Sequence, residues 1–235
     1  RNLSIEKQVM EIKKVKKNNY LVGAAIGVSP KDLERAEELF KVKTDLIVID
    51  TAHGHTQKVL NMISKIKKKL KNCTLCAGNI ATGKAAKFLA DSGVDIIKVG
   101  IGPGSICTTR LVAGIGVPQL SAVLDVKKAL KNYKTKIVSD GGIKFSGDLA
   151  KAIAAGADAV MIGSLFSGTM ESPGKIIKYK GKTYKNFRGM GSVGAMAVGS
   201  ADRYYQKRYK DVSKYVPEGV EGMVKFKGTV KKIIY

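Results

Sequence analysis

Short apolar runs alternate with amphipathic stretches along most of this chain, which limits the fold to a few α/β architectures. The apolar runs predict six strands, at residues 21–28, 46–50, 73–77, 96–99, 136–139 and 159–162. The stretches between them predict helices at residues 30–40, 56–70, 82–92, 121–130 and 146–155, with Ser29, Thr82, Ser121 and Ser146 as candidate N-caps. Strands that are apolar along their whole length and alternate with helices are typical of a parallel sheet covered by helices.

Glycine and polar residues follow nearly every predicted strand, as in residues 50–54, 78–79, 140–142 and 163–164. Functional residues repeated at the carboxyl ends of successive strands are typical of a (β/α)8 barrel, or TIM barrel. An open doubly wound sheet would concentrate them at one switch point. No G-x-G-x-x-G fingerprint opens a helix here, which disfavours a Rossmann domain.

Six strand–helix units are fewer than the eight of a closed barrel. We therefore expect residues 1–235 to form one partial barrel domain of class α/β, with the first two strands absent from this chain. Residues 167–235 depart from the alternation and are rich in glycine, tyrosine and lysine. They predict a long flap over the barrel mouth, because loops of this length usually act as lids or binding loops.

The strongly basic composition allows two interpretations. The formal net charge is +23, but arginine contributes only six of the 42 basic residues. Bidentate recognition of phosphates and bases favours arginine, so a lysine-biased surface is the preferred interpretation. A basic nucleic-acid-binding module remains the alternative. The same positive field would attract an anionic nucleotide substrate.

Cysteine usage and hydropathy bear on the compartment. No apolar stretch reaches the about 18 residues that a membrane span needs. Three cysteines without a periodic framework predict a reducing, cytoplasmic location. Cys73 and Cys76 form a C-x-x-C pair, but it lies in a predicted strand without a second pair, which disfavours a metal or redox role.

The glycine-dense loop of residues 100–110 carries the third cysteine, Cys107. Glycines allow close backbone approach to a ligand, and their amides can form a nest for an anion. With Ser105 and Thr109 as polar neighbours, the loop predicts a nucleophilic thiol facing a phosphorylated substrate. A buried structural cysteine in a tight turn is the alternative.

Two further loops are candidates for holding the substrate. In barrels the last two strand–helix loops commonly bind phosphate, and here these loops carry Gly142, Gly163 and Ser164. An ionised Asp140 cannot bind phosphate, so it is predicted to accept hydrogen bonds from ribose hydroxyls. Its alternative role is that of a turn residue before two glycines.

Taken together in order and spacing, these loops resemble the inosine-5′-monophosphate (IMP) dehydrogenase family. The resemblance runs from about Leu21 to Gly228. It rests on residues 23–27, 50–55, 77–79, 100–110, 140–143, 163–165, 188–192, 202–206 and 217–222.

The resemblance implies NAD-dependent oxidation of IMP to xanthosine monophosphate (XMP) in guanine nucleotide biosynthesis, through a covalent thioimidate on Cys107. Arg203 matches the family's general base on a mobile flap, with Tyr204 beside it, and Thr109 matches a residue that activates water. The implied substrate ligands are Ser105, Asp140, Gly142, Gly163, Ser164, Met190, Gly191 and Glu218.

The resemblance also implies NAD ligands, a bound cation and an oligomeric state. The implied NAD ligands are Asp50, Thr51, Ala52, Asn79, Gly100 and Gly102. Backbone carbonyls of Gly102, Gly104 and Cys107 would bind potassium. A cytoplasmic homotetramer is implied, with no membrane association and no nucleic acid needed for activity.

Two further positions bear on the phosphate contact and on the origin of the chain. Phe187 stands where the family usually has a tyrosine whose hydroxyl reaches the phosphate, so that contact is not expected here. Ala52 matches the bacterial form.

Guanosine-5′-monophosphate (GMP) reductase, which has a similar cysteine loop and barrel, is the runner-up. It lacks the Asp-Arg-Tyr flap, so Arg203 and Tyr204 favour the dehydrogenase. A non-catalytic phosphate-binding barrel is a third possibility.

Overall fold

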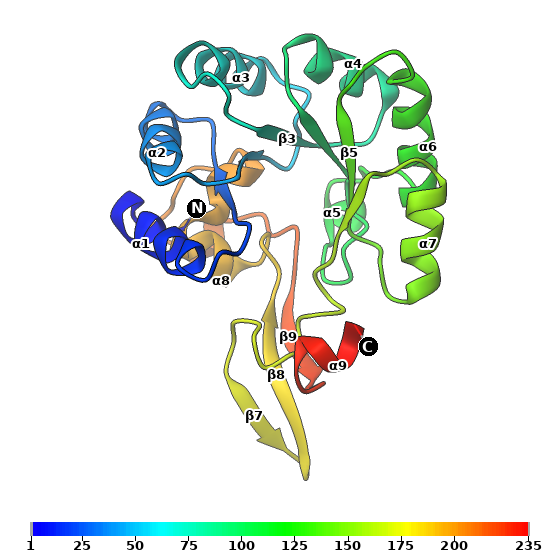
Figure 1. The fold of residues 1–235 in the computed structure, drawn as a ribbon. Coiled ribbons are helices and arrows are strands. Elements are labelled where there is room, and N and C mark those ends of the chain that lie inside the picture. The colour runs from blue at the N-terminus through cyan, green and yellow to red at the C-terminus, as the bar shows by residue number, and fades with distance from the viewer. Residues whose placement is uncertain (1, 235) are drawn as a thin grey trace.

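The structure, a computed structural model, describes residues 2–234. Figure 1 shows the fold of the chain. Six parallel strands form its main sheet, in the order in which they occur along the chain. Their bounds are β1 Gly23–Ile26, β2 Leu46–Asp50, β3 Leu75–Ile80, β4 Ile96–Val99, β5 Lys136–Asp140 and β6 Ala159–Met161. All six predicted strands are therefore confirmed, with ends that differ by a few residues.

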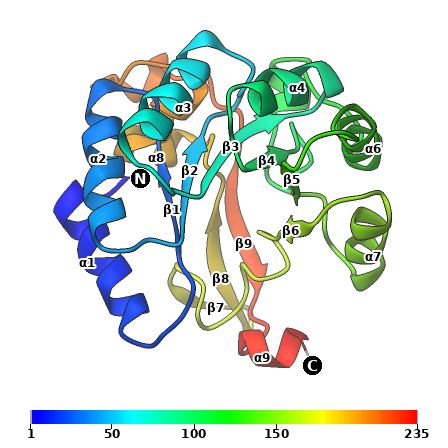
Figure 2. The same cartoon turned by 45° about the horizontal axis from the view of Figure 1, so that its top comes forward.

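The sheet curls, so that its strands follow an arc with the helices on the outside (Figure 2). The outer helices are α2 Pro30–Lys41, α3 Gln57–Lys69, α4 Gly83–Asp91, α6 Gln119–Ala129 and α7 Ser146–Ala154. Each strand hydrogen-bonds in parallel to the next, as Ile47 aligned with Leu75 illustrates. This arrangement corresponds to part of a (β/α)8 barrel, as predicted.

The predicted helix caps are confirmed in part. Thr82 accepts a hydrogen bond from the amide of Ala85, and Ser29 precedes α2 with its amide and hydroxyl bonded to Asp32. The predictions for Ser121 and Ser146 were wrong. Helix α6 begins two residues earlier, after Pro118, and Ser146 is the first helical residue of α7, where the Asp148 carboxylate accepts the amide of Phe145.

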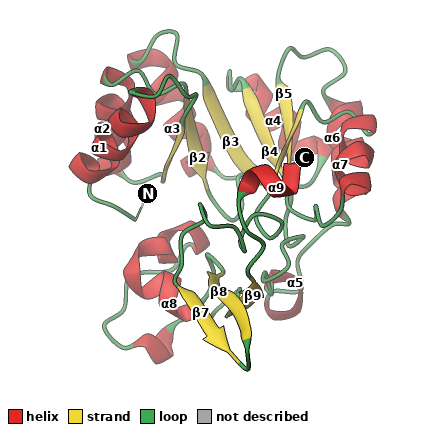
Figure 3. Ribbon diagram, turned by 60° about the horizontal axis from the view of Figure 1, so that its bottom comes forward, coloured by secondary structure: helices red, strands yellow, loops and turns green. Residues whose placement is uncertain are grey.

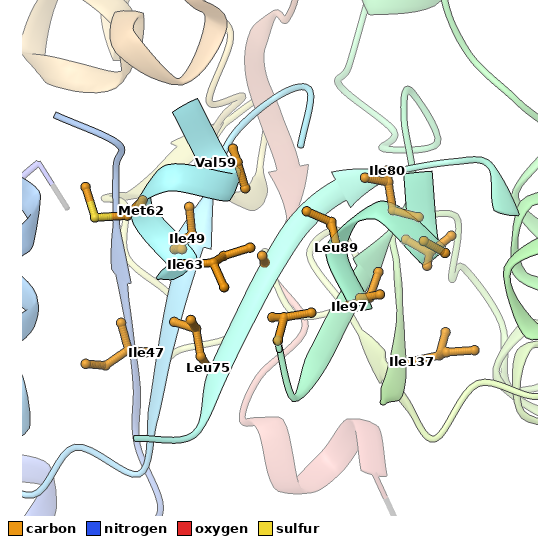
Figure 4. Packing of buried hydrophobic residues seen from close by; sticks show 14 of the residues in the cluster. Ile47, Ile49, Val59, Met62, Ile63, Leu75, Ile80, Leu89, Ile97 and Ile137 are labelled. Carbon is orange, nitrogen blue, oxygen red and sulfur yellow. The ribbon is translucent and has the colours of Figure 1, made fainter. Parts of the chain in front are cut away.

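The core lies between the strands and the outer helices. Ile47, Leu75, Ile97 and Ile137 from four adjacent strands are at most 1% exposed. They belong to one cluster with residues of α3 and α4, such as Ile63 (Figure 4). Burying one such side chain contributes about 1.5–3 kcal/mol, so this layer holds the strand ends in place.

A helix that the sequence did not predict precedes the first strand. It is α1, Ile5–Lys16, which begins at the N-cap Ser4 and packs against α2. Gln8 of this helix donates to the carbonyl of Ala25 in β1 and accepts from Arg35 in α2.

The chain after β6 is not a structureless loop. It forms a three-stranded antiparallel sheet of β7 Ile176–Tyr179, β8 Lys182–Arg188 and β9 Glu221–Lys225. Figure 3 shows this second sheet apart from the parallel one. Short helices complete the chain: α5 Thr109–Val112, α8 Val193–Ala195 and α9 Val230–Ile234. A π-helical segment at Met196–Ser200 and 3-10 helices at Ala201–Tyr204 and Val212–Lys214 follow α8 along the chain.

No helix within residues 2–234 combines the length and the hydrophobicity that crossing a bilayer requires.

Candidate active site

A cavity of about 660 Å³ opens where the parallel strands end. Most of the predicted site residues line it: Asp50, Ala52, Asn79, Gly100, Gly102, Gly104, Cys107, Thr109, Asp140, Met190, Gly191, Arg203, Tyr204 and Glu218. They come from the ends of β2, β3 and β5, from the chain after β2 and β4, and from the chain beyond β8. The folded chain thus brings together residues that are up to 168 positions apart, from Asp50 to Glu218.

The strand ends can meet so closely because Gly100 carries no side chain. Its φ is +149°, and a Cβ atom built there would lie 2.1 Å from the carbonyl oxygen of Asp140. Gly191 allows a similar approach, because a Cβ there would lie 2.9 Å from the backbone of Glu218 and 3.0 Å from the Tyr204 ring.

Cys107 begins a chain of hydrogen bonds that ends on a carboxylate. Its thiol donates to the hydroxyl of Thr109 at 3.2 Å, and that hydroxyl donates to Oε2 of Glu218 at 2.8 Å. A backbone hydrogen bond also joins the two segments that carry Thr109 and Glu218, since the amide of Thr108 donates to the Glu218 carbonyl. A carboxylate at the end of such a chain can accept a proton that is relayed through the hydroxyl.

A buried lysine that the sequence analysis did not select lies at the centre of the cavity floor. Lys98 of β4 is 4% exposed, and its ammonium group donates to Asp50 at 3.2 Å, to Asp140 at 2.7 Å and to the side-chain oxygen of Asn79. Asn79 also donates to Asp140 at 2.9 Å. A buried ion must be paired, so Lys98 and the two carboxylates hold each other in place.

Lys98 could have been found from its position in the sequence. It interrupts the otherwise apolar run of Ile96, Ile97 and Val99, and a lysine is almost never fully buried unless it is paired.

Arg203 also lines the cavity and binds Asp50. Its Nε donates to Oδ2 of Asp50 at 2.9 Å, and its guanidinium group lies 5.2 Å from the centre of the Tyr204 ring. Burial lowers the pKa of Arg203, but the Asp50 carboxylate, together with Tyr204 and Asp140, more than offsets it, so the pKa lies above its usual value. In this arrangement Arg203 is held as a cation.

Burial also affects Tyr204. It raises the pKa of the phenol above its usual value, and the neighbouring Arg203 offsets this only in part.

The segment around Arg203 docks on the loop after β2. The amide of Ala52 donates to the carbonyl of Arg203 at 2.9 Å, and the Tyr205 hydroxyl donates to the carbonyl of His53 at 2.6 Å. Residues 201–205 therefore contact Asp50 and Ala52, two of the residues that were predicted to contact NAD.

Five predicted site residues do not line the cavity: Thr51, Ser105, Gly142, Gly163 and Ser164. Thr51 is 1% exposed, and its hydroxyl donates to the carbonyl of Gly78, which gives it a structural contact. Ser105, Gly142 and Gly163 are exposed and Ser164 is half-buried, on loops next to cavity residues such as Gly104, Gly141 and Met161. Phe187 is half-buried in β8.

The remaining two cysteines lie in the core. Cys73 is 5% and Cys76 is 2% exposed, and both thiols are free. Burial raises the pKa of Cys73 and raises that of Cys76 to about 12. Within residues 2–234, no group of three or more histidine, cysteine, aspartate or glutamate side chains is placed to hold a metal ion.

Comparison with known proteins connects this site to a family. The family model for the IMP dehydrogenase / GMP reductase domain matches residues 1–235. The chain is 56% identical over 212 residues to inosine-5′-monophosphate dehydrogenase of Rhizobium tropici, covering 90% of this chain and 43% of that protein.

Two further relatives carry the same name. Identity is 54% over 215 residues to the Streptococcus pyogenes protein, covering 92% of this chain and 44% of that protein. Identity is also 54%, over 217 residues, to the Borreliella burgdorferi protein, covering 92% of this chain and 54% of that protein. The chain thus spans about half the length of the curated relatives it matches. With the cysteine loop, the strand-end cavity and these matches together, the chain belongs to the IMP dehydrogenase / GMP reductase domain family.

Proposed function

We propose that the protein oxidises IMP to XMP with NAD as hydride acceptor, in guanine nucleotide biosynthesis. The observation that carries this proposal is the hydrogen-bonded series of Cys107, Thr109 and Glu218 inside the strand-end cavity. It places a nucleophile and a proton acceptor in one hydrogen-bonded series, which covalent catalysis requires.

IMP would bind with its ribose hydroxyls on Asp140, which Lys98 and Asn79 already hold in place. Its phosphate would lie at the loops that carry Ser105, Gly142, Gly163 and Ser164. Met190, Gly191 and Glu218 would face the base. Phe187 offers no hydroxyl, so the phosphate would depend on the loops alone.

The reaction has two steps. The Cys107 thiolate adds to C2 of the purine, and the hydrogen at C2 leaves as a hydride. NAD, when bound, accepts that hydride. Water then attacks the thioimidate carbon, the carbon–sulfur bond breaks, and XMP and the free thiol are released with one proton to the solvent.

Thr109 and Glu218 are well placed to take the proton of the attacking water, since the Thr109 hydroxyl accepts from the thiol and donates to Glu218. Arg203, expected as the general base, is bound to Asp50, which favours its charged form. Its base role therefore requires a rearrangement that weakens this ion pair. As a cation, Arg203 would orient water and close the site.

The small side chains beyond Asp50 suit a planar nicotinamide. Gly23, Ala25 and Ala52 line that end of the cavity. Asp50 and Ala52 are also the residues on which residues 201–205 dock, so dinucleotide and flap would occupy the same place in turn. The flap would close after NADH has left, and hydrolysis alone would depend on closure.

The carbonyls of Gly102, Gly104 and Cys107 are hard oxygen donors of the kind that suit potassium. The Cys107 amide donates to the Gly104 carbonyl at 3.1 Å, which ties the cysteine to this set. A cation bound there would set the position of the Cys107 backbone. We further propose a cytoplasmic homotetramer that needs neither membrane nor nucleic acid for activity.

The full-length protein should form NADH from IMP and NAD, followed by its absorbance. Cys107→Ala should abolish NADH formation, while calorimetry still detects IMP binding, because the ribose and phosphate contacts lie elsewhere. Undiminished turnover in this variant would rule out Cys107 as the nucleophile.

GMP reductase activity is the second candidate, because the family model includes it. Conversion of GMP to IMP with consumption of NADPH, without NADH formation from IMP, would favour it.

A further inference from the structure

The turn that follows β6 and the segment after it are bound by two lysines that the mechanism above does not use. Lys227, beyond β9, donates to the carbonyls of Ser164 at 3.4 Å and Leu165 at 3.0 Å. Lys185 of β8 donates to the carbonyls of Thr169 at 2.8 Å, Met170 at 3.3 Å and Ser172. Lys227 thus binds the turn itself, and Lys185 binds the segment directly after it.

Neither lysine is an ordinary surface residue. Lys185 is 2% exposed and Lys227 is half-buried. Within residues 2–234, neither forms an ion pair with a carboxylate. Lys98 in the cavity floor, by contrast, faces two carboxylates. The turn and the segment after it therefore bind two ammonium groups whose partners are backbone carbonyls.

Backbone geometry fixes where the amides of the turn point. In a trans peptide the carbonyl and the following N–H point in opposite directions. Because Lys227 binds the carbonyl of Ser164, the amide of Leu165 points away from the lysine. The amide of Phe166 is used inside the turn, where it donates to the carbonyl of Gly163 at 3.2 Å. Among the described residues, the amides of Ser164 and Leu165 have no acceptor.

The backbones of the two segments are joined as well. The Lys227 amide donates to the Gly168 carbonyl at 2.8 Å, and the Met170 amide donates to the Gly228 carbonyl at 2.7 Å. A Cβ at Gly168 would lie 2.3 Å from the carbonyl oxygen of Lys225, so the approach needs a glycine. Lys227 is thus held where its side chain can reach the turn.

We propose that Lys227, supported by Lys185, is a positioning residue for the substrate phosphate. By binding the Ser164 carbonyl, which also accepts from the Ser167 hydroxyl at 2.8 Å, it directs the amide of Leu165 toward the phosphate. The two ammonium charges also favour a dianion at this turn. This proposal rests on the proposed function for the identity of the substrate, and it supplies the cations that the predicted phosphate ligands lack.

The test compares ligands with and without a phosphate on the full-length protein. In Lys227→Met, calorimetry should show IMP affinity lowered roughly tenfold, the effect of about 1.4 kcal/mol. Inosine, which lacks the phosphate, should bind as in the unaltered protein. Inorganic phosphate should compete with IMP less well in the variant. In turnover, KM for IMP should rise while kcat and KM for NAD stay unchanged.

Matched variants separate positioning from general damage. Lys227→Arg should restore IMP affinity, and Lys182→Met, at an exposed lysine of β8, should leave it unchanged. If Lys227→Met does not fold, Lys227→Gln takes its place and should show the same selective loss. An equal loss for IMP and inosine, or no loss for either, would overturn the proposal.

The two proposals can fail separately. If the unaltered protein forms no NADH from IMP, the proposed function fails, while the calorimetric comparison still tests the role of Lys227. If NADH forms and Lys227→Met binds IMP normally, only the positioning role fails.

Discussion

At the scale of single residues, the three cysteines of this chain differ in reactivity because their surroundings differ. Cys107 is partly exposed in the cavity, whereas burial raises the pKa of Cys73 and brings that of Cys76 to about 12. Only the thiolate is nucleophilic, so iodoacetamide near pH 8 should label Cys107 well before the other two. Peptide mass spectrometry measures this order, and IMP should slow the labelling of Cys107 alone. Labelling of Cys76 at a rate equal to that of Cys107 would contradict this expected difference in thiol reactivity.

At the scale of elements, the docked segment of residues 201–205 should control hydrolysis and not hydride transfer. Its contacts to the end of β2 and the loop after it include the Arg203–Asp50 ion pair, the hydrogen bond from the Ala52 amide to the Arg203 carbonyl and the Tyr205–His53 hydrogen bond. Arg203→Ala should keep a pre-steady-state burst of NADH and slow steady-state turnover by roughly 100-fold or more. Tyr205→Phe should slow it only about two- to tenfold, as expected for one neutral hydrogen bond. Stopped-flow absorbance separates the phases, and equal loss of both in Arg203→Ala would place Arg203 in the first step.

At the scale of the whole molecule, a net charge of +23 should attract the nucleotide before contact. Exposed charges more than about 10 Å apart are screened at 0.1 M salt. With potassium held constant, raising the ionic strength from about 0.05 to 0.3 M should therefore lower kcat/KM for IMP several-fold. Inosine binding should barely change, which calorimetry can check. A kcat/KM for IMP that does not change with salt would mean that the surface lysines do not attract the nucleotide.

The local sequence pattern was sufficient to predict the strands and helices of the parallel sheet. Its strands are continuous apolar runs and its helices have a clear polar face, so all six strands and the five helices between them could be predicted. The boundaries were less certain, because alternatives such as Pro118 and Ser121 compete to start a helix. The antiparallel sheet of β7 to β9 was missed because its strands carry polar, lysine-rich faces that resemble a loop.

The sequence by itself determined the α/β class, the cysteine loop and the polar residues after each strand, because these depend on short-range periodicity and on glycine. Only the tertiary structure decided which residues meet. Lys98 sits between Asp50 and Asp140 because the adjacent strands β2 to β5 end at the same edge of the sheet, and Glu218 reaches Thr109 across 109 residues of chain. Lys227 and Lys185 bind the turn after β6 and the segment that follows it for the same reason. Such contacts join distant segments through packing, which no local pattern encodes.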